Sequence, residues 1–132
     1  MKVMIVEDDY ITSQVMKEIL INYGDCDIAE DGLQAINLFT EGLIDGFPYD
    51  LIFLDIMMPS LDGQETLTRI RGIEREFGIT GLDGVKIVMT TALDDFDNIK
   101  KAFHSQCEGY IVKPVEKEKI VQKLIELGFL DG

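Results

Sequence analysis

Short apolar runs alternate with stretches of helical spacing along this chain. Apolar runs of this kind suit strands that are covered on both faces of a parallel sheet, and they lie at residues 2–6, 26–29, 51–54, 85–90 and 109–112. Between them, apolar residues recur every three or four positions, as on one face of a helix. The alternation predicts an α/β fold: a doubly wound, five-stranded parallel sheet with right-handed crossovers and five helices on its two faces.

The first predicted helix starts at Tyr10 and has Gly24 as its C-cap. Its predicted inward face is apolar and consists of Ile11, Val15, Ile19 and Tyr23. The second predicted helix follows a turn at Asp31 and Gly32 and ends before Gly42. Its apolar positions are Ala35, Ile36 and Phe39. Two glycines and a proline between Gly42 and Asp50 predict a loop over that whole segment.

The other three helices are predicted from the same spacing. The third opens at Gly63 or Gln64, and its inward residues are Leu67, Ile70, Ile73 and Phe77. A glycine-rich loop at 78–84 follows it. A short fourth helix is capped by Asp94 or Asp95, and its apolar positions are Phe96, Ile99 and Phe103. The last helix carries Val115, Ile120, Leu124 and Leu127.

Composition narrows the classes of function. The 132 residues predict one domain, 1–132, without a linker or an output domain. The formal charge of −13 argues against binding nucleic acid or an anionic membrane, and it is compatible with a cation site. The chain has no membrane-length apolar run and enters strand-like sequence at once, so we expect no membrane insertion and no signal peptide. Cys26 and Cys107 lack CxxC spacing, so we expect reduced thiols and a cytoplasmic protein.

The stretch from Leu51 to Gly63 organises the rest of the chain. The apolar run ends at Asp55, where the central strand leaves the covered part of the sheet. In an open α/β sheet, ligands and chemistry collect at this carboxyl edge. Pro59 and the pair Asp62-Gly63 then turn the chain into the next helix. Acids are also common at strand ends, so Asp55 alone does not establish a site.

Polar groups end four of the five predicted strands: Glu7-Asp8, Asp55, Thr91 and Lys113. Parallel topology brings these groups to one edge, where three acids would repel one another. Mg²⁺ would relieve the repulsion, because it prefers a few carboxylates together with water and phosphate oxygens. An Asp carboxylate can attack phosphorus to form an aspartyl phosphate, with the metal and a lysine neutralising the transferred group.

Each of these groups also has an ordinary structural reading. The acids after the first strand can cap a helix, the threonine can be a turn hydroxyl, and the lysine can end a strand in solvent. Four such signals in the right order favour a common site over coincidence.

The chain resembles the receiver domains of two-component response regulators, of the single-domain CheY type. The matching residues extend from residue 2 to about 127 and are Val6-Glu7-Asp8, Asp31-Gly32 with Ala35, Asp55 with Met58-Pro59 and Asp62-Gly63, Thr91-Ala92, and Lys113-Pro114. The resemblance implies the strand order 2-1-3-4-5 and a cis peptide bond between Lys113 and Pro114.

The resemblance also implies roles for individual residues. Asp55 is the expected phosphoacceptor, Asp8 a direct Mg²⁺ ligand and Glu7 its partner acting through water. Met57 is expected to offer its backbone carbonyl to the metal, and Asp9 is expected to be a helix cap. Lys113 is the expected contact to the phosphoryl group, and it acts with Thr91 in the chemistry. Thr91 is also the expected switch hydroxyl, and Tyr110 the switch aromatic.

The implied function is a phosphorylation-activated signalling switch. A histidine kinase or histidine phosphotransfer protein would phosphorylate Asp55, and residues 92–103, Tyr110 and the start of the last helix would then bind a protein target. We expect no enzyme activity beyond the domain's own phosphorylation and dephosphorylation, and a monomer or a weak phosphorylation-dependent dimer. His104, the only histidine, is expected to be exposed and without a catalytic role.

Three other functions fit part of the pattern. A flavodoxin-like electron carrier would need a Ser-, Thr- and Gly-rich phosphate loop where this chain has Glu7-Asp8-Asp9. An aspartyl-nucleophile phosphatase usually has a second acid at the position of Met57. A receiver fold that has become a phosphorylation-independent docking module remains the main alternative.

Overall fold

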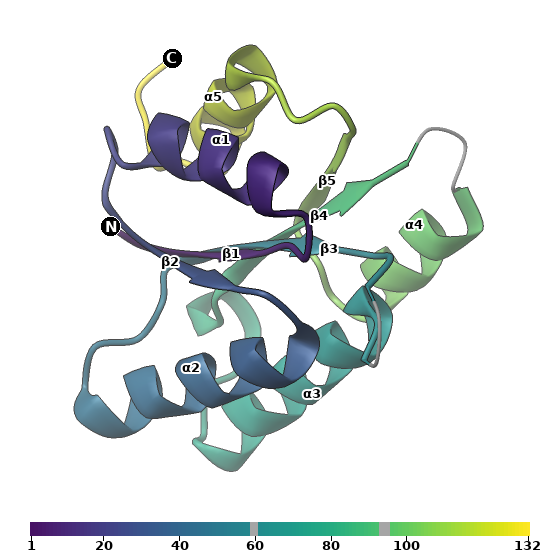
Figure 1. The fold of residues 1–132 in the computed structure, drawn as a ribbon. Helices are drawn as coiled ribbons and strands as arrows, with labels where there is room; N and C mark the ends of the chain where they lie inside the picture. The colour runs from purple at the N-terminus through teal and green to yellow at the C-terminus, as the bar shows by residue number, and fades with distance from the viewer. Residues whose placement is uncertain (59–60, 93–95) are drawn as a thin grey trace.

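The structure is a computed structural model that describes residues 1–58, 61–92 and 96–132. It contains a parallel five-stranded sheet in the order β2-β1-β3-β4-β5, which confirms the predicted topology (Figure 1). The strands are β1 (Lys2–Val6), β2 (Asp25–Ala29), β3 (Leu51–Asp55), β4 (Lys86–Thr91) and β5 (Gly109–Val112). The peptide bond between Lys113 and Pro114 is cis, as the resemblance implied.

Five α-helices cover the sheet in two layers, with α1 and α5 on one face and α2, α3 and α4 on the other (Figure 1). The helices are α1 (Tyr10–Leu20), α2 (Gly32–Asp45), α3 (Gly63–Glu76), α4 (Phe96–His104) and α5 (Lys117–Glu126), with a short 3₁₀ helix at Gly81–Asp83. Strand β3 is buried over its whole length because both layers pack against it. No helix in the described ranges is long and apolar enough to cross a bilayer.

Helix α1 differs from its prediction in its buried face. Its buried residues are Ser13, Met16 and Leu20, whereas Ile11 is 72% exposed and Val15 is 45% exposed. Both faces have helical spacing, and packing of Met16 and Leu20 into the core selects the second one. Ser13 tolerates burial because its hydroxyl donates to the carbonyl of Tyr10.

The predicted ends of the first two helices were wrong as well. Helix α1 ends at Leu20, with Ile21 as its C-cap, and Gly24 lies beyond a turn. Helix α2 continues through Gly42 to Asp45, so residues 42–45 are helical and not a loop. Its C-cap is Gly46, which has a φ of +78°, a conformation that favours glycine.

Helix α3 buries two charged residues that apolar periodicity does not reveal. Leu67 and Ile70 point inward as predicted, but Phe77 caps the helix and is 48% exposed. The buried positions of the last turns are instead Arg71 and Glu74.

Arg71 joins α3 to the amino ends of β4 and β5. Its guanidinium donates to Glu74 Oε1 at 2.7 Å, to Glu108 Oε1 at 2.7 Å, and to the carbonyls of Val85 and Gln106 at 2.7 and 3.0 Å. Burial raises the pKa of Glu108, and the Arg71 charge opposes that shift. The network therefore satisfies a buried cation and its two acids together.

The last two helices follow their predicted patterns in part. Ile99 and Ala102 are the buried residues of α4, whereas Phe96 and Phe103 are 64% and 46% exposed. Ile120 and Leu124 are buried in α5, and Val115 is buried just before that helix begins. The predicted caps Asp94 and Asp95, and Pro59 of the turn, lie outside the described residues.

We expect Arg71→Met to lower the free energy of unfolding by about 3–5 kcal/mol, because it leaves two acids in low-dielectric surroundings without their partner. Arg69→Met is the matched control, since Arg69 pairs with Glu65 on the surface and both side chains are about half exposed. The control should cost less than about 1 kcal/mol. Urea denaturation of both variants measures the difference, and equal losses would contradict the assignment of Arg71 as a structural anchor.

Candidate functional site

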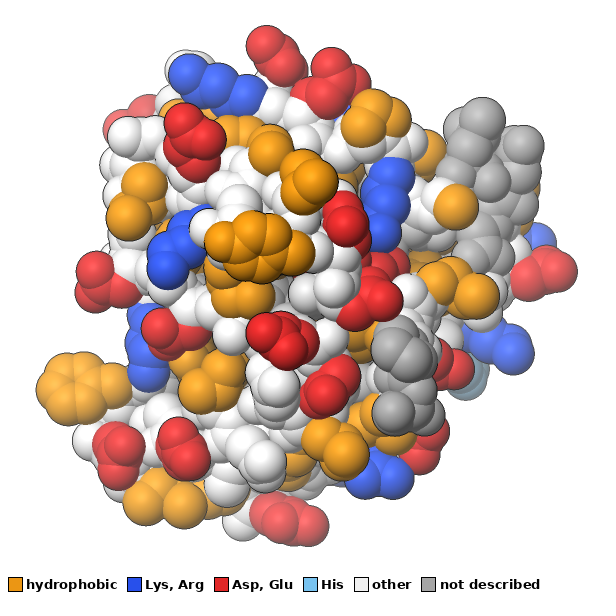
Figure 2. Space-filling model, in the orientation of Figure 1, with side chains coloured by type: hydrophobic (Ala, Val, Ile, Leu, Met, Phe, Trp, Pro, Cys, Tyr) orange, Lys and Arg blue, Asp and Glu red, His pale blue; other side chains and the backbone are white. Residues whose placement is uncertain are grey.

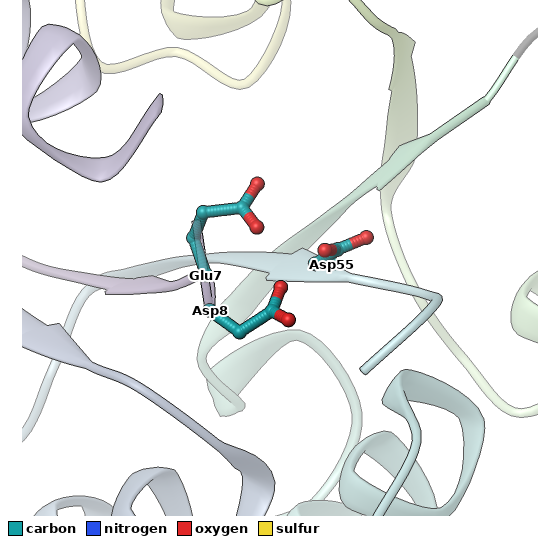
Figure 3. A group of neighbouring side chains, drawn as sticks. All are labelled: Glu7, Asp8 and Asp55. Atoms are coloured by element: carbon teal, nitrogen blue, oxygen red, sulfur yellow. The ribbon is translucent and has the colours of Figure 1, made fainter. Parts of the chain in front are cut away.

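The predicted acids meet at the carboxyl ends of β1 and β3. These strands pair in register, with Val6 opposite Leu54. Glu7 and Asp8 directly follow β1, and Asp55 is the last residue of β3, so the pairing of the strands places all three at one edge. Figure 3 shows their carboxylates side by side there. One oxygen from each lies within 4.8 Å of the others.

The start of α3 packs against this edge of the sheet. Asp62 caps the helix by accepting from the amide of Glu65, and the amide of Gly63 donates to the carbonyl of Ile56. A Cβ on Gly63 would lie 2.3 Å from the carbonyl oxygen of Asp55, so only glycine permits this approach. The predicted Asp62-Gly63 turn therefore packs the helix directly against the backbone of the central acid.

Lys113 is the cation that faces these acids. Its Nζ lies 3.0 Å from Glu7 Oε1 and 3.2 Å from Asp55 Oδ2. Glu7 and Asp55 are buried, whereas Asp8 is exposed. Burial by itself lowers the pKa of Lys113, but its contacts with Glu7 and Asp55 outweigh burial, so the pKa is raised and the ammonium stays charged. The positive charge of Lys113 therefore offsets part of the repulsion among the three neighbouring carboxylates.

Glu7 remains poorly compensated despite this lysine. Burial, followed by the hydrogen bond and charge of Asp55, raises the pKa of Glu7, while Lys113 acts in the opposite direction. Glu7 Oε1 is shielded from solvent and accepts no hydrogen bond of good geometry, although the lysine ammonium is close. Its other oxygen accepts weakly from the amide of Asp9 at 3.2 Å. A buried carboxylate oxygen that lacks a good hydrogen bond is a suitable ligand for a cation.

The donor set fits Mg²⁺. This ion prefers carboxylate oxygens and keeps several waters, and Glu7, Asp8 and Asp55 offer oxygens only. Asp8 is exposed, which leaves the group open to solvent on that side. These three residues are the ones that would hold the ion. The backbone carbonyl of Met57, the fourth ligand implied by the resemblance, stays a prediction.

Residues around Asp55 orient its carboxylate. The amide of Met57 donates to Asp55 Oδ1 at 3.2 Å, while Lys113 approaches Oδ2. The side chain of Met57 points to solvent and is 66% exposed. Asp9 is the N-cap of α1, as predicted: it accepts from the hydroxyl and the amide of Thr12, and these two hydrogen bonds, the hydroxyl's first, lower the pKa of Asp9. The two oxygens of Asp55 thus have different donors.

The two predicted switch residues lie on β4 and β5, the strands that follow β3 in the sheet. Thr91 is buried at the end of β4, and its hydroxyl donates to the carbonyl of Ala92 at 3.3 Å. Tyr110 on β5 is partly buried, with its ring edge-on to Phe103 at 6.1 Å and the ammonium of Lys123 at 5.8 Å from its centroid. Thr91 is thus on the strand beside β3, and Tyr110 is on the edge strand that leads to Lys113.

An exposed apolar surface beside the acids was missed by sequence reasoning. Tyr10 is 73% exposed and Ile11 is 72% exposed, and both begin α1 just after the acidic residues. Figure 2 shows hydrophobic side chains at the surface over α1, with acidic side chains near them. Periodicity assigned Ile11 and Val15 to the core, and only the orientation of α1 on the sheet reveals that they face solvent.

The remaining sequence predictions concern single residues. His104 is exposed at the end of α4, as predicted. Cys26 and Cys107 are both free thiols, also as predicted. Burial raises the pKa of Cys107 to about 11, so this thiol is largely unreactive at neutral pH.

Comparison with known proteins agrees with this geometry. The probable transcriptional regulator ycf29 of Porphyra purpurea is 32% identical over 98% of this chain, which spans 57% of that relative. The chemotaxis protein CheY of Halobacterium salinarum is 28% identical over 96% of this chain and 95% of its own length. The chain thus covers little more than half of the first relative and nearly all of the second.

Solved structures show the same architecture. The receiver domain of Ssk1 from Saccharomyces cerevisiae, crystallised with the histidine phosphotransfer protein Ypd1, is 31% identical and superposes with a TM-score of 0.84, covering 97% of this chain and 88% of that one. The receiver domain of the histidine kinase CKI1 from Arabidopsis thaliana, complexed with Mg²⁺ and BeF₃⁻, is 25% identical with a TM-score of 0.77, covering 95% and 89%.

The family model for the response regulator receiver domain matches residues 3–125, which include every residue of the acid group, the switch positions and the lysine. The chain therefore belongs to the response regulator receiver family of two-component signalling.

Proposed function

We propose that this chain is a phosphorylation-activated switch that accepts a phosphoryl group on Asp55 in the presence of Mg²⁺. The observation that carries the proposal is the placement of Asp55, whose buried carboxylate lies within 4.8 Å of two further acids and 3.2 Å from the ammonium of Lys113. A nucleophilic carboxylate with a cation on one oxygen and oxygen ligands beside it suits phosphoryl transfer, where positioning and charge neutralisation supply most of the catalysis.

The donor in this proposal is a phosphohistidine. One oxygen of Asp55 forms a bond to phosphorus while the phosphorus–nitrogen bond breaks, and the imidazole leaves with that electron pair and takes up a proton. Lys113 neutralises charge on the transferred group, and the amide of Met57 holds the carboxylate by its Oδ1 atom. Glu7, Asp8 and Asp55 would hold Mg²⁺, and the ion would supply further charge neutralisation. The only chemistry assigned to the chain is its own phosphorylation and dephosphorylation.

The phosphodonor is a histidine kinase or a histidine phosphotransfer protein. The Ssk1 receiver domain, which has the same fold, was crystallised with such a protein. In this chain, the exposed apolar residues Tyr10, Ile11 and Val15 lie on α1 directly after the acidic residues. A donor that buried them would bring its histidine close to Asp55, because α1 begins at the same edge of the sheet.

The output is a change in packing around Thr91 and Tyr110. Adding a charged phosphoryl group at Asp55 would favour an arrangement in which the Thr91 hydroxyl turns towards the new oxygens. Tyr110 is only partly buried, with its ring edge-on to Phe103, so a change of its side-chain conformation does not require a fully buried ring to move. The surface of α4, β5 and α5 would then bind a protein target. A cytoplasmic protein that signals through this contact as a monomer or weak dimer is consistent with the proposal.

Intact mass spectrometry tests the proposal against a phosphorylation-independent docking module. With acetyl phosphate and Mg²⁺, we expect a gain of one phosphoryl group that disappears in Asp55→Asn and with EDTA. Asp62→Asn is the matched control, because Asp62 is a helix cap outside the acid group and asparagine caps equally well. Uptake that persists in Asp55→Asn would place the phosphoryl group elsewhere. No uptake from acetyl phosphate or from a phosphorylated phosphotransfer protein would favour the docking module.

Mg²⁺ binding has its own test. We expect Mg²⁺ to raise the melting temperature by mass action, and Asp8→Asn to weaken its binding at least about tenfold, because it removes a charged ligand. Asp9→Asn should bind normally, since asparagine preserves the cap of α1. Because burial and Asp55 raise the pKa of Glu7, its carboxyl takes up a proton at a higher pH than an ordinary glutamate and the proton competes with the metal, so the affinity for Mg²⁺ should fall as the pH is lowered. Titration calorimetry measures each affinity, and equal losses in both variants would contradict the assigned ligands.

The proposed donor surface is tested by charge substitution. We expect Ile11→Glu to slow phosphoryl transfer from a phosphorylated histidine phosphotransfer protein about tenfold or more, while uptake from acetyl phosphate is unchanged. A small donor does not need the apolar surface, whereas a protein donor would have to desolvate the new charge. Ile44→Glu is the matched control, because Ile44 is 69% exposed on α2. Equal effects of the two substitutions would refute docking on α1.

A further inference from the structure

The ammonium of Lys113 is positioned by a short connection. Strand β5 ends at Val112 and α5 begins at Lys117, so only four residues join the two. The amide of Lys113 donates to the carbonyl of Thr91 at 2.7 Å, which ties the connection to β4. Lys113 can reach Asp55 and Glu7 only while this backbone stays in place. A second contact that fixes this backbone would therefore also help to fix the position of the Lys113 ammonium.

The other side is held by Lys119, on the first turn of α5. Its Nζ donates to the carbonyl of Val112 at 2.9 Å and to the carbonyl of Pro114 at 3.1 Å. These carbonyls belong to the residues on either side of Lys113. Glu116 Oε1 lies 3.7 Å from the same ammonium, in a solvent-exposed ion pair. Bonds from a charged donor are stronger than those between neutral groups.

Peptide geometry makes this arrangement a clamp. In a trans peptide the N–H and C=O point in opposite directions. The N–H of the Val112–Lys113 peptide points to Thr91 on β4, so its C=O points to the free side of β5, which is the edge strand. No further strand can satisfy that carbonyl, and the ammonium of Lys119 does so instead.

We propose that Lys119 is a positioning residue for phosphoryl transfer, which clamps the backbone on both sides of Lys113 and so holds the Lys113 ammonium against Asp55. The inference rests on the proposed function, because it assumes that Lys113 acts on the transferred group. It also couples α5 to the reaction: the helix that presents part of the target-binding surface holds the lysine that neutralises the phosphoryl group.

The first test is the rate of phosphorylation by acetyl phosphate. Lys119→Met keeps the aliphatic stem but removes the donors, and we expect it to lower the maximal rate about three- to tenfold with little change in the half-saturating concentration, because Lys119 does not touch the donor. Lys119→Arg should restore the rate, since a guanidinium offers several N–H donors. Lys117→Met is the matched control, because Lys117 is exposed on the same turn, and its rate should be unchanged.

A double-mutant cycle separates positioning from a general structural effect. In a Lys113→Met background, Lys119→Met should cause no further loss of rate, since nothing remains for it to position. An equal loss in both backgrounds would overturn the proposal. So would an unchanged rate in Lys119→Met alone, or a failure of Lys119→Arg to restore it.

Amide hydrogen exchange gives a readout that does not need phosphorylation. We expect the Lys113 amide to exchange about tenfold faster in Lys119→Met than in the parent or in Lys117→Met, with core amides unchanged. If the parent chain takes up no phosphoryl group, the proposed function fails, and the exchange rate still decides whether Lys119 clamps this segment. Unchanged exchange at Lys113, or equal acceleration of all amides, would overturn the clamp.

Discussion

The contact between the Lys113 ammonium and the buried carboxylates of Glu7 and Asp55 is the interaction on which this site depends. Two acids at the end of a parallel sheet cannot both stay charged and buried without a cation nearby. The lysine provides that cation at 3.0 and 3.2 Å, yet it leaves Glu7 with a raised pKa and an oxygen without a good hydrogen bond. This partial compensation is the feature of the acid group that supports the proposed binding of Mg²⁺ and the proposed phosphorylation of Asp55.

Two networks hold the opposite ends of β5 in different ways. At its amino end, the buried Arg71 pairs with Glu74 and Glu108 and donates to two carbonyls, those of Val85 and Gln106. At its carboxyl end, the connection through Lys113 is held by the Thr91 carbonyl and by the partly exposed Lys119. Tyr110 lies between them. A strand that is anchored firmly at one end and held by solvent-accessible bonds at the other can move at the second end without unfolding.

The exposed surface of α1 and the surface formed by α4, β5 and α5 are connected to the acid group through different residues. Helix α1 begins directly after Glu7 and Asp8, whereas β5 leads directly to Lys113. In the proposed cycle, a phosphodonor contacts one and a target contacts the other. The physical separation allows both proteins to depend on one phosphorylated residue without sharing the same binding residues.

The sequence alone determined the strands, their parallel order through the family resemblance, and the residues of the acid group, because strand ends in a parallel sheet must meet at one edge. It failed where two choices had equal local patterns. Ile11 and Val15 have the same helical spacing as Ser13, Met16 and Leu20, and only the fit of α1 against the sheet decides which face is buried. Gly42 looked like a helix end, but the structure places the left-handed conformation at Gly46. The bonds that Arg71 and Lys119 make to backbone carbonyls carry no sequence signal, since those carbonyls come within reach only when the strands and helices pack. Hydrophobic periodicity indicates which faces of a helix or strand can be buried. Hydrogen bonds from long charged side chains depend instead on the positions of backbone carbonyls in the folded structure.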